Sequence, residues 1–274
     1  MINKLKKDKL CWTGVIILLG ISAVSLIGLL GFDNESLHPN MGERLLPPSA
    51  QHPFGTDHLG RCIFSRIVEG GKLTLQVSTI SLMATIAIGL PLGLIGAYFG
   101  GKLDALIMRV VDGVASFPDF ILAIVIAGML GPSLHNVVLA IVIVKWIQYA
   151  RLARGTILPE KQKEYIIAAK SMGCRNGRIL CKHLLPVVLP QTLTMASVDM
   201  GKIILIIASL SYLGLGAQPP TPEWGAMLND AAPYFQTEPL LMLIPGLMIL
   251  LTVLSFNFIG DAIRESFNVR ATEK

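Results

Sequence analysis

Long apolar segments alternate with short polar connections along most of the chain. Six of them have the length of a membrane-spanning helix, and they cover roughly residues 11–32, 73–100, 105–131, 134–152, 191–217 and 239–260. A hydrocarbon core about 30 Å thick requires about 20 helical residues, because each residue adds about 1.5 Å. The pattern predicts an all-α polytopic membrane protein with six transmembrane helices.

Two polar segments separate these spans on one side. They cover residues 33–72 and 217–237, and both are rich in Pro and Gly. Such punctuation is typical of ordered loops with short helices. The first apolar run, from Cys11 to Phe32, follows lysines as a signal peptide does. It is long and lacks a small-x-small cleavage site, so we expect a retained transmembrane helix.

The basic residues predict the orientation of the spans. If the six helices alternate in direction, most Lys and Arg residues fall on one side, which the positive-inside rule assigns to the cytoplasm. Both termini are then expected to be cytoplasmic, in a bacterial cytoplasmic membrane. Four basic residues, Arg44, Arg61, Arg66 and Lys72, lie in the first outer loop, while the inner set comprises Lys4, Lys6, Lys7, Lys9, Lys102, Arg151, Arg154, Lys161, Lys163, Lys170, Arg175, Arg178, Lys182, Arg264, Arg270 and Lys274.

Composition and motifs exclude several classes of function. The chain has 274 residues, of which 53% are hydrophobic and 15% charged, too apolar for an ordinary soluble domain. The net charge of +5 does not indicate nucleic acid, because the basic residues flank spans instead of forming one patch. Residues 96–103 nearly match a phosphate-binding loop, but Leu103 replaces the required hydroxyl. No metal-binding spacing of Cys or His and no catalytic cluster is present, so we expect no bound cofactor and no enzyme.

Charged residues inside the spans should face protein or water, because a charge in lipid is costly. They are Arg109, Asp112, Asp119, Lys145, Asp199 and Lys202. Asp199 and Lys202 are three residues apart and so are neighbours on one helical face. They either line a translocation path or form a structural pair. Ser209 and Ser211, near Gly214 and Gly216, mark either a packing seam or a gate.

The segment 164–190 lies between the fourth and fifth spans and carries an unusual helix. Glu164 suits a helix N-terminus, and Ile166, Ala169 and Gly173 share one face of small residues that would fit a partner's groove. After a break at 174–177, a second short helix is expected to carry Arg178 and to end at Pro186 and Pro190. The alternative is a basic loop that rests on anionic headgroups.

This segment resembles the cytoplasmic loop of binding-protein-dependent ABC importer permeases. Their pattern is E-A-A, three residues, Gly, nine residues, I-x-L-P, and it is matched by Ala168, Ala169, Gly173, Leu185 and Pro186. Ile167 stands in place of Glu and His183 in place of Ile. The form E-Y-I-x-A-A-K-S-x-G with H-L-L-P is similar to the dipeptide/oligopeptide/nickel branch.

Two further segments resemble that branch. HPFGTDHLGR, with Ser65 and Arg66, is similar to its outer-loop signature, and SYLGLGAQPPTPEWGAMLNDA to its fifth-span signature. Cys62 departs from the usual Asp after Gly-Arg. Within the branch, residues 44–61 and 198–216 most resemble nickel-importer permeases of the C type.

The resemblance implies an ABC type I importer permease fold in three parts: an N-terminal helix with its outer loop (1–72), a core of five helices (73–265) containing the coupling loop 157–190, and a tail (266–274). It implies contacts with the membrane lipid, a second permease subunit as heterodimer, an extracytoplasmic binding protein and two cytoplasmic ATPases that bind and hydrolyse ATP. The ATPase contacts would be Glu164, Ala168, Ala169 and Gly173, flanked by Arg175 and Arg178.

The transported substrate stays open at this point. The resemblance implies nickel or another metal chelate, with a dipeptide or oligopeptide as the alternative. A proton- or sodium-driven carrier, which would need no ATPase partner, is the alternative of another class.

Overall fold

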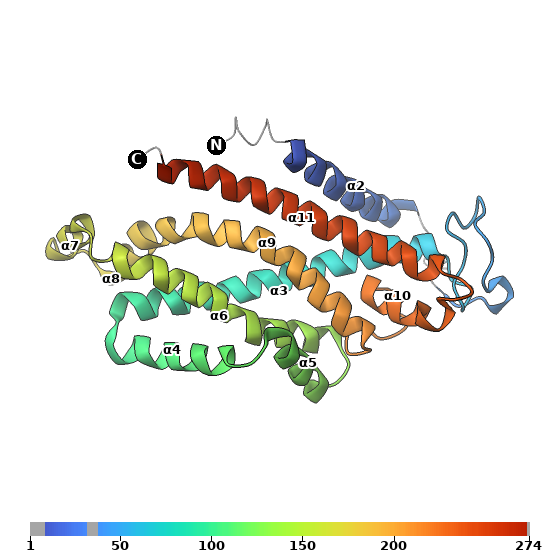
Figure 1. Ribbon diagram of the computed structural model, residues 1–274, viewed down its shortest axis with the longest axis horizontal. Helices are drawn as coiled ribbons and strands as arrows, with labels where there is room; N and C mark the ends of the chain where they lie inside the picture. The colour runs from blue at the N-terminus through green and yellow to red at the C-terminus, as the bar shows by residue number, and fades with distance from the viewer. Residues whose placement is uncertain (1–8, 32–37, 273–274) are drawn as a thin grey trace.

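The computed structural model describes residues 9–31 and 38–272 as a long helical bundle (Figure 1). The helices that run along its long axis are α2 (Lys9–Gly31), α3 (Ile63–Phe99), α6 (Leu134–Glu160), α9 (Leu185–Tyr212) and α11 (Leu240–Thr272). Helix α3 packs mainly on α6, and α11 packs on both α9 and α2. The predicted all-α class is confirmed.

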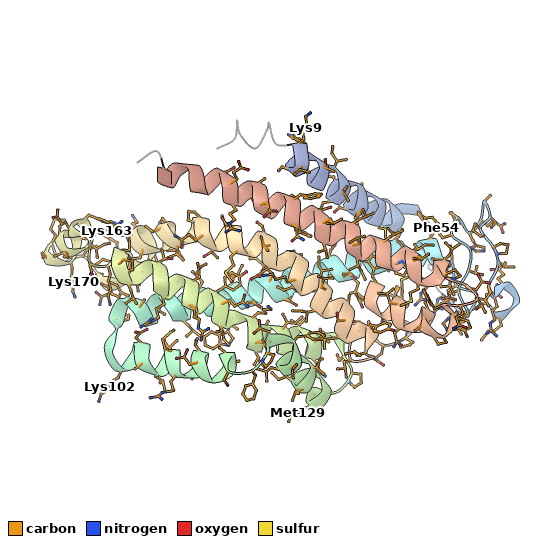
Figure 2. All side chains as sticks on the ribbon, in the orientation of Figure 1. Lys9, Phe54, Lys102, Met129, Lys163 and Lys170 are labelled. Atoms are coloured by element: carbon orange, nitrogen blue, oxygen red, sulfur yellow. The ribbon has the colours of Figure 1, made fainter. Side chains whose placement is uncertain are left out.

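Short elements close the two ends of the bundle. At one end, called here the α7 end, lie α7 (Glu164–Ser171) and α8 (Asn176–Arg178). The opposite end, the α10 end, carries the loop 38–62 with helix η2 (Met41–Glu43), α10 (Trp224–Ala231) and η4 (Ala232–Tyr234). In Figure 2, Lys102, Lys163 and Lys170 lie at the α7 end and Phe54 at the α10 end. The short helices predicted for the two polar segments are therefore present.

Four helices of the described chain are long and apolar enough to cross a membrane by themselves. They are α3, α6, the continuous helix Asn176–Tyr212, and α11 up to Ser266. A broken pair of helices would provide a fifth crossing, and α2 contains a shorter apolar stretch, Lys9–Ala23. Each predicted segment corresponds to helix, but six complete crossings are not confirmed. Phe32 and the lysines before Lys9 lie outside the described residues.

The third predicted span, 105–131, is not one helix. It is divided into α4 (Gly101–Ala115) and α5 (Asp119–Leu130), which meet at 88°. Pro118 precedes α5 directly. A proline removes a backbone donor and disfavours helical geometry in the residue before it, which explains the break. The prediction of an unbroken span is wrong because average hydropathy does not register one proline.

The predicted stop at Pro186 and Pro190 is also wrong. Helix α8 continues through a π-helical stretch, η3 (Ile179–Leu184), directly into α9, which contains both prolines. A proline ring collides with the carbonyl group four residues earlier in a regular helix. In the π turn the Leu185 N–H donates to Leu180, five residues back, so the geometry ahead of Pro186 is widened. The helix of the predicted fifth span therefore starts at the α7 end.

Small residues bring α3 and α6 into close contact. Helix α3 begins at Ile63, ten residues before the predicted span, and buries Thr74, Ser78, Ser81 and Thr85 completely. Gly89 and Gly93 lie against the backbone of α6, where a Cβ would overlap carbonyl oxygens. Such a small-residue face allows backbones to approach closely within a membrane.

Candidate functional site

Helix α7 is anchored to the end of α6. The Glu160 carboxylate accepts a hydrogen bond of 2.6 Å from the Tyr165 hydroxyl and pairs with Lys163 at 2.8 Å. Burial of the Tyr165 hydroxyl and the adjacent carboxylate raise the pKa of that hydroxyl to about 12. The tyrosine therefore stays protonated as a donor at neutral pH.

Two further contacts join the segment around α7 to the end of α3. The Tyr98 hydroxyl donates to Asn176 Oδ1 at 2.9 Å, and the Lys161 ammonium donates to the carbonyl oxygen of Ala97 at 2.6 Å. Because α8 leads directly into α9, the α7 segment is attached to three long helices at once. A displacement of α7 would therefore be passed to α3, α6 and α9.

Gly173 ends α7 in a Schellman motif. It has φ +76°, while Cys174 N–H donates to the Ala169 carbonyl and Gly173 N–H to the Lys170 carbonyl. Glycine suits this left-handed position because it has no Cβ. A Cβ here would meet no atom within 4 Å. The backbone angle, and not a lack of space, therefore favours glycine within this chain.

The small-residue face predicted to dock on a partner points partly inward. Ile166 and Ala169 are only 3% and 7% exposed, and Ile166 packs against residues of α3, α6 and α9 such as Leu94 and Ile157. Both residues thus belong to the core of this chain, and the ATPase contact expected of Ala169 stays a prediction. The exposed residues of the segment include Glu164, Ile167, Ala168, Met172, Gly173, Arg175 and Arg178.

The four residues proposed for a path or gate divide into two sets on α9. Lys202 and Ser209 lie with Leu205 and Tyr212 on the more accessible face, whereas Asp199 and Ser211 are 2% and 1% exposed. The Lys202 ammonium lies 3.5 Å from Asp199 Oδ1. Asp199 and Lys202 are thus neighbours, as predicted. The lysine side chain is exposed, whereas the carboxylate is buried.

Tyr149 of α6 was not singled out from the sequence. It is 1% exposed and lies within electrostatic reach of the Asp199 carboxylate. The Tyr149 hydroxyl interacts with the Asp199 side chain, although neither that hydroxyl nor Asp199 Oδ2 forms a hydrogen bond of standard geometry with a described residue. Buried polar atoms without a standard hydrogen bond are uncommon in folded proteins, and here they lie between α6 and α9.

Polar side chains on α6 hold the broken pair α4 and α5. Lys145 and Gln148 both bind the Asp119 carboxylate, at 3.1 and 3.0 Å. Arg151 contacts Asp112 at 2.8 Å, and Arg154 binds Asp104 through two bonds of 2.7 and 2.8 Å. These four residues recur every three positions, a helical spacing that was visible in the sequence. Arg109, in contrast, is exposed.

A buried cluster of charges fixes the loop 38–62 at the α10 end. Asp57 Oδ2 lies 2.7 Å from both Arg61 and Arg66, and Asp230 of α10 lies 3.3 and 2.8 Å from the same arginines. Asp57, Arg61 and Arg66 are each at most 3% exposed. Asp230 lies more than 160 positions away in sequence, so only the tertiary fold reveals the cluster.

The cluster also controls ionisation at this end. Burial opposes the charge of Asp57, but Arg66, Arg61 and the N–H groups of Arg61 and Leu59 outweigh it, so the pKa of Asp57 lies below its usual value. Burial lowers the pKa of His58, and Asp57 and Asp230 offset this only in part. His58 stacks on Tyr234 with ring centroids 5.2 Å apart.

Helix α3 also packs directly on the second signature segment, which leads into α10. Trp224 Nε1 donates to the carbonyl oxygen of Ile67 at 3.0 Å, and Thr74 donates to Glu223 at 3.1 Å. Trp224 and Glu223 are both completely buried. Cys62 is buried just before α3 and provides no side-chain cap for that helix.

Comparison with known proteins relates this architecture to transporters. The family described as binding-protein-dependent transport system inner membrane component matches residues 89–272, which include α7 and the α4–α5 pair. A solved structure of the MetNI methionine ABC transporter, in an inward-facing conformation, has the same fold with a TM-score of 0.59. It is 21% identical, over 73% of this chain and 95% of that one.

Curated relatives are more similar and cover most of the chain. The dipeptide transport system permease protein DppC of Alkalihalophilus pseudofirmus is 42% identical over 97% of this chain and 88% of its own length. The nickel transport system permease protein NikC of Escherichia coli is 38% identical over 93% of both chains. The glutathione transport system permease protein GsiD of Pectobacterium atrosepticum is 43% identical over 81% of this chain and 73% of its own length.

The names of these relatives give three different substrates, which are a dipeptide, nickel and glutathione, at 38–43% identity. The comparisons therefore do not distinguish the predicted nickel substrate from the dipeptide alternative. They agree on the class of protein, which is a transport subunit and not an enzyme. The chain belongs to the family of binding-protein-dependent transport system inner membrane components and is a multi-pass permease subunit of an ABC importer.

Proposed function

We propose that this permease subunit pairs with a second permease subunit and converts the closure of two cytoplasmic ATPases into movement of its membrane helices. Helix α7 is the contact point with one ATPase, through Glu164, Ala168 and Gly173 and the flanking Arg175 and Arg178. The α7 end and both termini then face the cytoplasm. An extracytoplasmic binding protein delivers the substrate to the α10 end.

The single observation that supports this proposal most is the mechanical position of α7. Its outer surface exposes Met172 (81%), although large apolar side chains usually avoid water. The segment that contains α7 is bonded to α6 through Glu160 and to α3 through Tyr98 and Lys161, and it continues through α8 into α9. A short rigid element of this kind transmits a rigid-body motion from a partner.

The direction in which α7 faces its partner can be tested by crosslinking. In a Cys174→Ser/Cys181→Ser background, Ala168→Cys and Met172→Cys should crosslink to a co-expressed ATPase carrying a cysteine at its docking cleft. Ala169→Cys is the matched control, because the adjacent Ala169 is 7% exposed and faces the chain's own core. Equal crosslinking from positions 168 and 169, or none from 168 and 172 in an active complex, would contradict the proposed contact.

The translocation path is proposed to follow the accessible face of α9. This face carries Lys202, Leu205, Ser209 and Tyr212, and a lysine within a span is costly in contact with lipid. The cost is avoided if the face lies toward the second permease subunit or toward water between the subunits. Asp199 and Ser211 lie on the buried side of α9 and are not part of this proposed path.

For the substrate, we infer a small polar molecule of the kind that the named relatives carry, with a nickel chelate as one candidate and a dipeptide or oligopeptide as the other. Residues 44–61 and 198–216 favour nickel. The 42% identity to a dipeptide permease favours the peptide. Competition between labelled nickel and labelled dipeptide for uptake, in cells that lack other importers, separates the two.

The energy source distinguishes this proposal from an ion-driven carrier. Uptake should stop when the phosphate-binding lysine of the partner ATPase is replaced by alanine, because ATP is bound by that partner and not by this chain. Dissipation of the proton gradient at constant ATP should leave uptake unchanged. The reverse pattern would identify a secondary carrier.

A further inference from the structure

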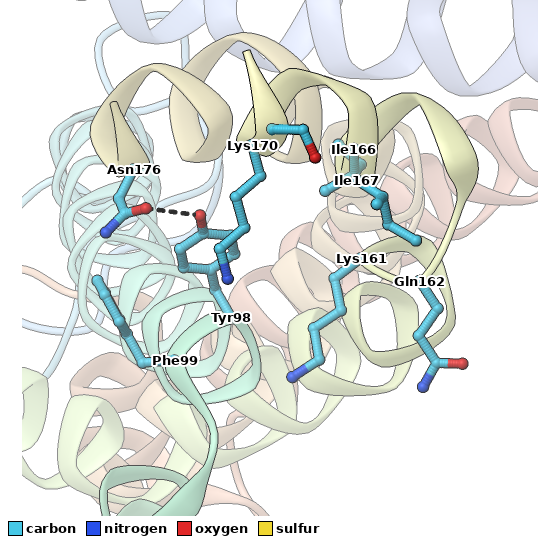
Figure 3. Close-up of a pocket in the computed structure, with 9 residues that line it drawn as sticks. Tyr98, Phe99, Lys161, Gln162, Ile166, Ile167, Lys170 and Asn176 are labelled. Atoms are coloured by element: carbon cyan, nitrogen blue, oxygen red, sulfur yellow. Dashed lines mark hydrogen bonds between the residues drawn. The ribbon is translucent and has the colours of Figure 1, made fainter. Parts of the chain in front are cut away.

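A cavity of about 730 Å³ opens between the end of α3 and helix α7. Tyr98 and Phe99 form one wall, and Gln162 and Ile167 belong to the opposite wall (Figure 3). The side chains of Lys161 and Lys170 extend between these walls. The cavity therefore combines two ammonium groups with apolar surface from both sides.

Among the described residues, the acidic groups around the two lysines lie beyond ion-pair distance; the Asp104 carboxylate is within electrostatic reach of Lys161. Neither forms an ion pair there; Lys161 donates only to the Ala97 carbonyl oxygen. The nearby carboxylates are already engaged, since Asp104 is bound twice by Arg154 and Glu160 is bound by Lys163 and Tyr165. The cavity thus has an excess of positive charge.

Hydrogen-bond donors around the lysines match an anion with several oxygen atoms. The Gln162 amide, the Ser171 hydroxyl and the Asn176 amide also line the cavity. Asn176 accepts from Tyr98 through Oδ1, so its NH₂ group remains available as a donor. Ammonium, amide and hydroxyl donors together suit a phosphate group.

The position of the cavity indicates where such a phosphate would come from. Tyr98 and Phe99 end the long apolar run of α3, and Gly100, Gly101 and Lys102 follow directly. Aromatic residues and lysines at the end of a span mark the headgroup layer of a membrane. Phe99 and Ile167 are each 54% exposed beside the lysines and offer apolar contact for the start of an acyl chain.

We propose that this cavity binds the headgroup of an anionic phospholipid, which bridges Lys161 on the α6–α7 turn and Lys170 on α7 at the end of α3. The lipid would occupy the space behind α7, on the side opposite its exposed Met172. This inference goes beyond the proposed function, because lipid binding to this chain requires neither ATP hydrolysis nor transport.

The test measures lipid retention directly. The purified chain, in detergent, is incubated with equal amounts of phosphatidylglycerol and phosphatidylcholine, and the bound lipid is counted by native mass spectrometry. We expect preferential retention of phosphatidylglycerol, and a loss of at least about fivefold in Lys161→Gln/Lys170→Gln, because each lysine near an anionic headgroup contributes measurably to binding. The matched control is Lys102→Gln/Lys182→Gln, two exposed lysines of the α7 end that do not line the cavity.

Further measurements distinguish a lipid headgroup from a small anion or a protein segment. Lys161→Arg/Lys170→Arg keeps the charge and should keep the lipid, so a loss there as well as in the glutamine variant, or an equal loss in the control pair, would overturn the proposal. Displacement of phosphatidylglycerol by free inorganic phosphate would indicate a site for a small anion and overturn it too. A photoreactive residue at Ile167 should capture lipid; capture only of an acidic segment of the ATPase would assign the cavity to that partner instead.

Discussion

At the scale of single residues, contact between α3 and α6 depends on the absence of side chains. A Cβ at Gly93 would overlap the carbonyl oxygen of Ala150, and one at Gly89 would overlap that of Trp146. In both cases the obstructing atom belongs to the backbone, which cannot rotate away as a side chain can. The two helices would have to separate to accept a methyl group.

Gly93→Ala should therefore lower the thermal stability of the purified protein. Overpacking of a tight contact costs about 1–3 kcal/mol, which exceeds the gain of about 0.5–1 kcal/mol from better helix propensity. The control is Gly128→Ala in α5, where a Cβ meets no atom within 4 Å. Thermal unfolding in detergent should show a loss for position 93 and none for position 128. Equal behaviour of both variants would refute the packing argument.

The Asp199–Lys202 pair gives a second prediction at this scale. Lys202→Met should destabilise the protein by about 1–3 kcal/mol, because it leaves a 2% exposed carboxylate without its cation. Asp199→Asn/Lys202→Met removes both charges and should recover most of the loss. Thermal unfolding of the two single variants and the double variant measures the coupling. Additive effects would mean that the two side chains do not stabilise each other.

At the scale of elements, α7 has an inner and an outer surface with different tasks. The inner surface, with Ile166 and Ala169, joins the core that it shares with α3, α6 and α9. The outer surface is free in this chain. Substitutions on the inner surface should therefore affect folding, whereas those on the outer surface should affect partner binding alone.

Gly173→Asp separates these effects when it is compared with Gly173→Asn. Both residues tolerate a left-handed backbone and have nearly the same shape, so the difference between them reports charge. The asparagine variant should retain most uptake. The aspartate variant should insert normally but lose uptake by about tenfold or more, because an unpaired charge at an interface costs about 2–5 kcal/mol. Normal uptake by the aspartate variant would argue strongly against a docking surface at this residue.

At the scale of the whole molecule, the two ends are built differently. The α10 end holds its loop with equal numbers of opposite charges, namely the buried Arg61, Arg66 and Asp57 and the partly buried Asp230. The α7 end carries Lys102, Lys163 and Lys170, and Arg264 of α11 lines a pocket with Leu152 and Pro190 (Figure 2). This asymmetry agrees with the charge distribution that the sequence predicts, and it supports the proposed orientation.

The α10 end should lose stability in mild acid. The pKa of His58 is lower in the folded protein than the ordinary value of 6.5, so the unfolded chain takes up a proton first as the pH falls. Stability is therefore fully present above about pH 6.5 and declines below it, because the protonated imidazole is partly buried and lies near Arg61 and Arg66. Thermal unfolding between pH 7.5 and 5.5 should show a smaller decline in His58→Phe, which keeps an aromatic ring on Tyr234. An unchanged decline would exclude His58 as the cause.

The helical class and the approximate helix positions could be predicted from the sequence because hydrophobic length is a local property. The family resemblance, carried by Ala168, Ala169, Gly173 and the two outer signatures, is also readable along the chain and is confirmed by the comparisons. The break at Pro118 had a local signal that hydropathy averaging concealed. The π turn before Pro186 had none, since prolines usually end a helix.

The sequence by itself determined which residues prefer lipid, where helices run and which family the chain resembles, because these depend on neighbours within a few residues. Only the tertiary structure decided that Ala169 faces inward, that Asp230 meets Arg66, and that Lys161 and Lys170 share a cavity. Those facts depend on contacts between segments far apart in the chain. The spacing of residues along one helix does not reveal which side another helix will cover.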